Sequence, residues 1–160
     1  MTSATAQQVV TFRLGDDHFA VDISTVERIL RYSPPTAVPG LPEWIEGVID
    51  FDGRAVPVID LRRRFGLPPV APRLETRVIV FTTGEEWIGT VVDAVLEVTT
   101  IGPEQLTPPP ALFRGLSAEY LRGLVRNEQR LLIFLEISRL LSATEQLELQ
   151  RLTEQGSPDV

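Results

Sequence analysis

Short hydrophobic runs rich in β-branched and aromatic residues alternate with polar turn signals along most of the chain. Val9–Leu14 and His18–Ile23 flank a Gly-Asp-Asp turn, and two such runs around a turn are typical of a β-hairpin. Val78–Phe81 and Trp87–Val92 flank a Gly-Glu-Glu turn in the same way. The pattern therefore predicts a mainly β protein with a hairpin early in each of two regions.

A further hairpin is predicted within Glu43–Leu61, EWIEGVIDFDGRAVPVIDL. Asp52-Gly53 between two β-rich runs favours a type I′ turn, because that turn needs positive φ at both central positions. Pro57 cannot donate to a strand ladder, so we expect its strand to have an edge or a bulge there. Asp60 is expected to cap a short helical turn over Leu61–Phe65.

Two helices are expected outside these hairpins. Ser24-Thr25-Val26-Glu27 fits a capping box, which predicts a short helix over about Thr25–Leu30. Ser142-Ala143-Thr144-Glu145 fits another, which predicts a C-terminal helix through about Leu152. Residues 153–160 are expected to be a disordered tail.

The chain also contains an internal duplication. Glu43–Leu61 matches Glu119–Ile137 at an offset of 76 residues, and Val10–Leu30 matches Ile79–Thr99 at an offset of 69. Gly47 meets Gly123 in this alignment. Two matches in the same order indicate two halves of related architecture.

The halves cover about residues 8–67 and 77–141, joined by a stiff proline-rich linker over residues 68–76. Many short strands with closely spaced turns predict two small five-stranded, SH3-like β-barrels. Each half has about 60 residues, which is small for independent folding, so we expect the barrels to share a hydrophobic core within one domain over residues 8–152.

Composition excludes several functions. The 160 residues carry a net charge of −7, which argues against a nucleic-acid partner. The chain has no Cys, no Lys and one His, so thiolate, Schiff-base and His-pair metal chemistry have no residues to use. We expect no catalytic residue, no metal and no cofactor. No signal peptide or membrane-spanning run is evident, so a cytoplasmic protein is expected.

Several side chains nevertheless allow two interpretations. Asp50, Asp52 and Asp60 could form a carboxylate site, or could serve a turn and a helix cap. His18 could be a catalytic base or a surface residue. Arg62-Arg63-Arg64 could bind phosphate or an acidic partner, or face solvent. Trp44 and Trp87 could anchor a partner or belong to the core, and the same choice applies to Val26 and Ile29.

The stretch Ile45–Arg62 resembles the CheW family, the coupling proteins of bacterial chemotaxis. That family has a pattern like I-x-G-V-x-N-x-R-G-x-x-V-P-V-[IV]-D-L-R. The resemblance extends over about residues 8–152, in segments that keep the family's order: Phe12–Gly15, Val21–Ile23 leading into Val26, Gly89–Val95, Ser117–Leu124 and Leu131–Leu141.

The resemblance implies a fold of two five-stranded β-barrels and an adaptor that is not an enzyme. It implies two partners, the regulatory domain of a CheA-type histidine kinase and the helical cytoplasmic tip of a chemoreceptor, with recruitment to membrane receptor arrays. The kinase-binding residues that it implies are Asp50, Asp52, Gly53 and Arg54. The receptor-binding residues that it implies are Val26, Arg28, Ile29, Val48 and Val92.

This chain departs from the family pattern at both surfaces. Asp50 and Asp52 replace the usual Asn and Arg, and an Arg-to-Asp change reverses charge and would repel the usual partner. Where the family often has Val-x-Glu-Ile, Arg28 stands in place of the acid. A divergent member with its own kinase and receptors is expected. Alternatives are a coupling protein for a pathway other than swimming, a structural component of receptor arrays, and a small carboxylate-based hydrolase.

Overall fold

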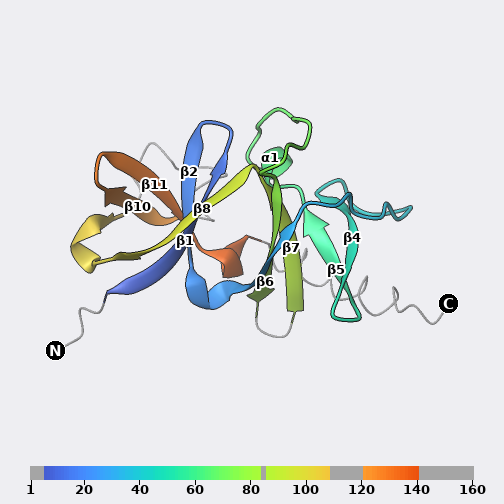
Figure 1. Cartoon of the computed structure of the whole chain (residues 1–160), viewed down its shortest axis with the longest axis horizontal. Helices are drawn as coiled ribbons and strands as arrows, with labels where there is room; N and C mark the ends of the chain where they lie inside the picture. The colour runs from blue at the N-terminus through green and yellow to red at the C-terminus, as the bar shows by residue number, and fades with distance from the viewer. Residues whose placement is uncertain (1–5, 84–85, 109–120, 141–160) are drawn as a thin grey trace.

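Two curled β-sheets lie side by side in the computed structural model, which describes residues 6–83, 86–108 and 121–140 (Figure 1). The first barrel contains, in spatial order, β8 (Ala94–Ile101), β1 (Gln7–Leu14), β2 (Asp17–Asp22), β11 (Arg130–Leu135), β10 (Leu121–Asn127) and the short β9 (Leu106–Thr107). The second barrel contains β3 (Val26–Arg31), β6 (Arg77–Thr83), β7 (Glu86–Val92), β5 (Arg54–Ile59) and β4 (Ile45–Phe51). The mainly β prediction is confirmed.

Short helical turns connect the strands. They are η1 (Ile23–Thr25), α1 (Leu61–Arg64), η2 (Pro103–Gln105) and η4 (Ile137–Arg139). None of the helices in the described part of the chain is long and apolar enough to cross a membrane. The predicted C-terminal helix and tail lie outside the described residues.

The strand order repeats between the barrels, but the barrels do not follow the boundary between the halves. Replacing each strand of β3-β6-β7-β5-β4 by its duplicate gives β8-β1-β2-β11-β10, the order of the first barrel. The first barrel combines the β1–β2 hairpin of the first half with strands of the second half. The second barrel combines the β6–β7 hairpin of the second half with strands of the first half. As a result, the second barrel is one continuous segment, residues 26–92, inserted between the two parts of the first.

Two equivalent glycines hold the same place in the two barrels. The pairing of β4 with β5 shifts register next to Gly47, and the pairing of β10 with β11 shifts next to Gly123. A Cβ at Gly47 would lie 2.7 Å from the carbonyl oxygen of Thr36, and a Cβ at Gly123 would collide with the carbonyl oxygen of Thr107. Only glycine lets these backbones approach so closely.

The β4–β5 hairpin follows the prediction. Asp52 and Gly53 have φ of 53° and 75°, as a type I′ turn requires. Both backbone groups of Val48 bond to Thr36, so Pro57, opposite Val48, has its nitrogen on the side facing β7. Pairing with β7 begins only at Val58, so that side is an edge at Pro57, as expected. Asp60 caps α1 by accepting from the backbone N–H of Arg63 at 3.1 Å.

The predicted helix over Thr25–Leu30 is wrong. This segment is a single 3₁₀ turn, η1, followed by strand β3, which pairs antiparallel with β6. The capping side chain is Asp22, whose carboxylate accepts from the backbone N–H of Ser24 at 2.9 Å. Strand pairing outweighs the local capping signal because β6 pairs with β3 from Val26 to Arg31, with one irregularity between Val26 and Arg28.

One hydrophobic cluster joins the two barrels, which confirms the expected shared core. It contains fully buried side chains from both, among them Phe12 and Leu14 of β1 and Ile79, Phe81 and Ile88 of the second barrel. Phe12 stacks on Phe19 at 5.4 Å, and Phe19 stacks on Phe65 beyond α1 at 5.6 Å. Separating the two barrels would expose the apolar side chains of this cluster to water.

A polar network also links the barrels. Arg62 of α1 pairs with Asp93 at 2.5 Å, and Asp93 accepts from the backbone N–H of Gly15 in the β1–β2 turn at 2.7 Å. The two charged side chains are only 13% and 18% exposed. Arg63 pairs with Glu43 at the surface, and Arg64 donates to the carbonyl of Leu140 at 2.9 Å. All three arginines thus have partners within the chain, which disfavours the phosphate-site interpretation.

We predict that Gly47→Ala destabilises the protein by about 1–3 kcal/mol, because the added methyl group forces the Thr36 backbone away from β4. Urea unfolding measures the change. Gly53→Asn is the control, since Asn tolerates positive φ at an open turn, and it should cost much less. Equal losses in the two variants would contradict the steric explanation.

We predict that Asp93→Asn lowers the free energy of unfolding by about 2–4 kcal/mol, since it leaves the nearly buried Arg62 guanidinium without a counter-charge. The matched control is Glu43→Gln, which removes the acid of the exposed Arg63 pair and should leave stability unchanged within error. Thermal and urea unfolding would both report the difference. Similar effects of the two substitutions would show that the network does not join the barrels.

Candidate partner-binding surfaces

The tip of the β4–β5 hairpin carries the residues expected to bind a kinase. Asp50, Asp52, Gly53 and Arg54 all lie there and are exposed to solvent. The type I′ turn fixes the direction in which the Asp52 side chain leaves the backbone, and strand β4 fixes that of Asp50. The hairpin therefore presents Asp50 and Asp52 as an acidic tip on a rigid strand pair.

A stack of rings and guanidinium groups supports this tip. Arg54 lies over the Trp87 ring at 4.0 Å, and Trp87 contacts Phe51 with ring centroids 5.1 Å apart. The guanidinium carbon of Arg28 on β3 lies 5.2 Å from the centroid of the Phe51 ring. Cation–π contacts of this kind hold long side chains in defined positions. Arg54 is therefore held against the hairpin and does not extend freely from it.

None of these ring contacts could be predicted from the sequence. The sequence allows Trp87 to anchor a partner or to belong to the core, and the structure places it half-buried beneath Arg54. Trp44, whose match in the duplication is Tyr120, packs against the shared core. Arg28 was assigned to the receptor-binding set, but its contact with Phe51 places it beside the hairpin tip. No local sequence signal joins β3 to β4, because the contact depends on closure of the barrel.

The other residues of the expected receptor-binding set separate by burial. Val92 is fully buried and belongs to the core, so it cannot touch a partner in this structure. Val26 is partly buried against the same core. Ile29 is 38% exposed on β3, and Val48 is partly exposed on β4. Val26 and Val48 are buried to a similar degree, but only Val26 packs against the core, so Ile29 and Val48 are the apolar members that we consider accessible to a partner.

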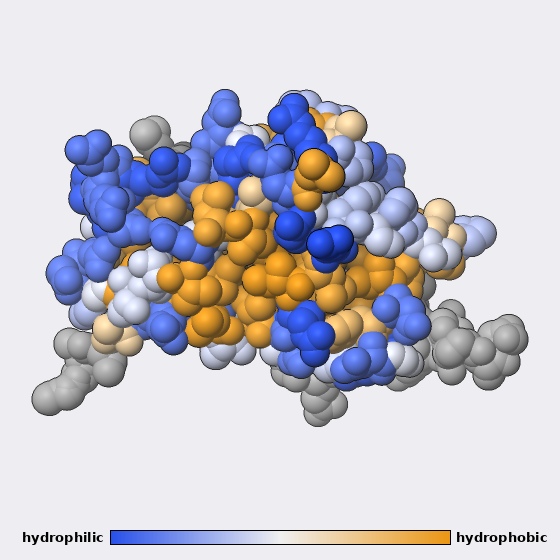
Figure 2. Space-filling model, viewed as in Figure 1, coloured by the Kyte–Doolittle hydropathy of each residue, from blue (hydrophilic) through white to orange (hydrophobic). Residues whose placement is uncertain are grey.

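A hydrophobic band crosses the face where the two barrels meet. Figure 2 shows it over the region in which β8 and β3 lie in front of their sheets. These two edge strands carry three exposed large hydrophobic residues, Leu96 and Val98 on β8 and Ile29 on β3. Val98 is the duplicate of Ile29, so the junction is flanked by matched apolar positions. Such a surface suits the apolar side of a helix.

The three aspartates of the hairpin do not form a carboxylate site. Asp52 and Asp60 lie beyond opposite ends of β5, whose 6 residues span about 20 Å at the usual rise of a strand. Asp60 is engaged as the cap of α1. Among the residues that the structure describes, no group of three His, Cys, Asp or Glu side chains is placed to hold a metal ion.

His18 contacts Arg130 between two hairpin tips of the first barrel. Burial lowers the pKa of His18, and the charges of Arg130 and Arg13 lower it further. Arg130 is always protonated and can only donate, so the imidazole Nε2 accepts. A nitrogen engaged in this way is not available to act as a base.

Asp22 positions the start of β3, which carries Arg28 and Ile29. Burial opposes its ionisation, but hydrogen bonds from Ser24 and Gln7 and the charge of Arg122 outweigh burial, so the pKa of Asp22 is lowered. The Gln7 amide donates to its carboxylate at 2.7 Å. The ionised form of Asp22 therefore stabilises the turn that precedes β3.

Comparison with known proteins is consistent with the fold. The family model of the CheW-like domain matches residues 8–145. The chemotaxis protein CheW of Klebsiella aerogenes is 37% identical over 139 residues, which cover 87% of this chain and 84% of that protein. A probable chemotaxis protein CheW of Rhizobium etli is 33% identical over 139 residues, covering 87% of this chain and 90% of that protein.

A solved structure is also similar. The crystal structure of the scaffolding protein TtCheW from Thermoanaerobacter tengcongensis superposes with a TM-score of 0.80 and 28% identity. The match covers 88% of this chain and 96% of that chain. Similarity at this level extends over both barrels.

We predict a pH-dependent stabilisation by Asp22. Because its folded-state pKa is lowered, its contribution is fully present above the unfolded-state pKa of about 3.9 and is lost as pH falls through the folded-state value. Asp22→Asn should therefore be less stable than the parent protein at pH 7 and should approach it near pH 3. Urea unfolding at both pH values tests this. Asp17→Asn, at an exposed position, is the control and should show no such convergence.

Proposed function

Because the chain belongs to the CheW family, we propose that it is a chemotaxis adaptor that couples chemoreceptor tips to a CheA-type histidine kinase. The family match over residues 8–145 carries this proposal, since it includes both barrels and both candidate surfaces. The adaptor would work by differential binding, with no chemical step of its own. A pathway other than swimming is not favoured over this function.

The kinase partner is proposed to dock on the β4–β5 hairpin. Asp50 and Asp52 offer negative charge at its tip, while Arg28 and Arg54 are held along its flank by ring contacts. A complementary kinase surface would therefore place a positive group opposite Asp52. This differs from the partner expected for a family member with Arg at that position, and it would give the pair its specificity.

The receptor partner is proposed to lay a helix along the hydrophobic band at the junction of the barrels. Ile29 and Val48 remain as contacts from the original set, and Val98 joins them as the exposed duplicate of Ile29. Val26 and Val92 would act from beneath by holding β3 and β7 in place. Helix binding in a groove depends on a few buried apolar anchors of this kind.

The absence of enzymatic activity is part of the same proposal. Asp60, His18 and Arg62 are each engaged in a structural contact, so none of them is free to act as an acid, a base or a phosphate ligand. Localisation in the cytoplasm, with recruitment to membrane receptor arrays, follows from the proposed partners. No cofactor is needed for an adaptor of this type.

Calorimetric titration with the regulatory domain of the histidine kinase from the same organism tests the proposal. We predict that Asp52→Arg weakens binding by about tenfold or more, because a charge at a complementary contact is reversed. Glu128→Arg is the matched control, since Glu128 is the duplicate of Asp52, also with positive φ, at 59°, on the other barrel. It should leave kinase binding unchanged.

Two outcomes would contradict the proposal in different ways. Kinase binding that is insensitive to Asp52→Arg would exclude the hairpin as the kinase surface. Binding of a receptor-tip fragment without any kinase binding would instead identify a structural component of receptor arrays. Failure to bind either partner would remove the coupling function while leaving the fold intact.

A further inference from the structure

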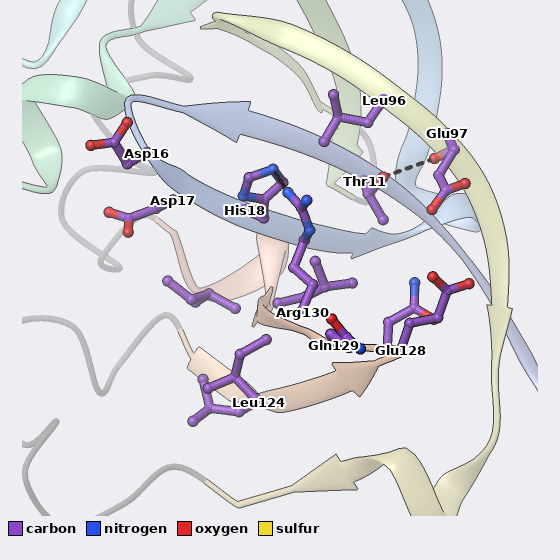
Figure 3. Close-up of a pocket in the computed structure, with 14 residues that line it drawn as sticks. Thr11, Asp16, Asp17, His18, Leu96, Glu97, Leu124, Glu128, Gln129 and Arg130 are labelled. Atoms are coloured by element: carbon purple, nitrogen blue, oxygen red, sulfur yellow. Dashed lines mark hydrogen bonds between the residues drawn. The ribbon is translucent and has the colours of Figure 1, made fainter.

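The first barrel has an open hollow of about 1100 Å³ between two hairpin tips (Figure 3). One tip joins β1 to β2 and the other joins β10 to β11. The parallel pairing of β2 with β11 extends over only two residue pairs, Phe19 with Ile133 and Ala20 with Phe134. The hairpins therefore diverge toward their tips, and the hollow occupies the wedge between them.

The same wedge exists in the second barrel, where side chains fill it. The parallel pairing of β5 with β7 is equally short. The Trp87 ring lies against Phe51, and both pack with Val56 and Val80 in one hydrophobic cluster. Arg54 closes the cluster by lying over the Trp87 ring at 4.0 Å.

The duplication explains why the first barrel is hollow. At the two offsets, His18 replaces Trp87, Asn127 replaces Phe51 and Thr11 replaces Val80. Each of these three replacements is smaller or more polar than the residue it matches, whereas Val56 is matched by the larger Leu132, which is buried in another hydrophobic cluster. Arg130, the duplicate of Arg54, is retained. The first barrel thus keeps the guanidinium that covers the wedge but lacks the aromatic rings beneath it.

The lining defines the chemistry of a ligand. Leu96 and Leu131 are apolar and exposed, by 45% and 52%. Figure 3 shows His18 and Arg130 pointing toward one another from the two hairpins, so the guanidinium is held in place within the hollow. Four acidic residues also line it, namely Asp16, Asp17, Glu97 and Glu128. The hollow therefore combines apolar walls and a fixed cation with a net negative lining.

We propose that this hollow is a docking site for a segment of a partner protein that presents an aromatic side chain flanked by basic residues. The aromatic ring would occupy the place that Trp87 fills in the second barrel and would stack against Arg130. The basic neighbours would meet the four carboxylates. The volume is far larger than one ring, which fits a short segment of chain. The site lies on the other barrel from the proposed kinase hairpin.

The test uses the full chain labelled with ¹⁵N and the capped pentapeptide Arg-Gly-Trp-Gly-Arg as the probe. We expect saturable shifts of the backbone amides of Leu96, Arg130 and Leu131. Replacing the peptide's Trp by Ala, or both Arg by Glu, should weaken binding by about tenfold or more in each case. Shifts that instead cluster around the β4–β5 hairpin, or no shifts at millimolar peptide, would overturn the proposal.

Two variants test the site from the protein side. His18→Trp restores the ring present in the second barrel and should abolish peptide binding by filling the hollow. Leu131→Ser removes the apolar surface of an exposed wall residue without adding charge, so the fold should persist, and binding should fall by about tenfold. Val70→Ser, at a loop residue that is 54% exposed, is the matched control and should not alter binding. Unchanged binding in either His18→Trp or Leu131→Ser would refute the site.

Discussion

Neither half of this chain completes a barrel with its own strands, and the rest of the structure depends on that exchange. The hairpin of β1 and β2 closes against β8 and β11, and the hairpin of β6 and β7 closes against β3 and β5. The shared core and the Arg62–Asp93 pair lie where the exchanged pieces meet. The hydrophobic band on β3 and β8 is located by the same exchange, because both are edge strands beside the junction.

Duplication supplies one frame twice, and the side chains then make the two barrels different. The paired glycines Gly47 and Gly123 preserve the frame by the same close approach to a threonine carbonyl. In the duplication, Asp93 is matched by Ser24 and Arg62 is matched by Ser138. The Arg62–Asp93 ion pair therefore has no counterpart at the equivalent positions. The second barrel has a filled aromatic cluster and the first has an open hollow. Similar backbones can thus carry unrelated surfaces on the two sides of one adaptor.

The sequence predicted those features that depend on local chemistry. The turn at Asp52-Gly53, the cap at Asp60 and the early hairpins are confirmed because each is determined within a few residues. The helix over Thr25–Leu30 failed because pairing with β6 outweighed a capping signal. Its duplicate over Ala94–Thr99, AVLEVT, contains three β-branched residues, which favour a strand.

The candidate sites were predictable only in part, for the same reason. The hairpin motif located the acidic tip, but the ring contacts of Arg28, Arg54 and Trp87 arise from three strands that barrel closure brings together. The burial of Val92 likewise depends on the shared core, which no local pattern describes.

The insertion of the second barrel within the first also sets an order of assembly. The segment 26–92 can close during synthesis, whereas the first barrel must wait until β11 leaves the ribosome, and such distant pairing slows folding.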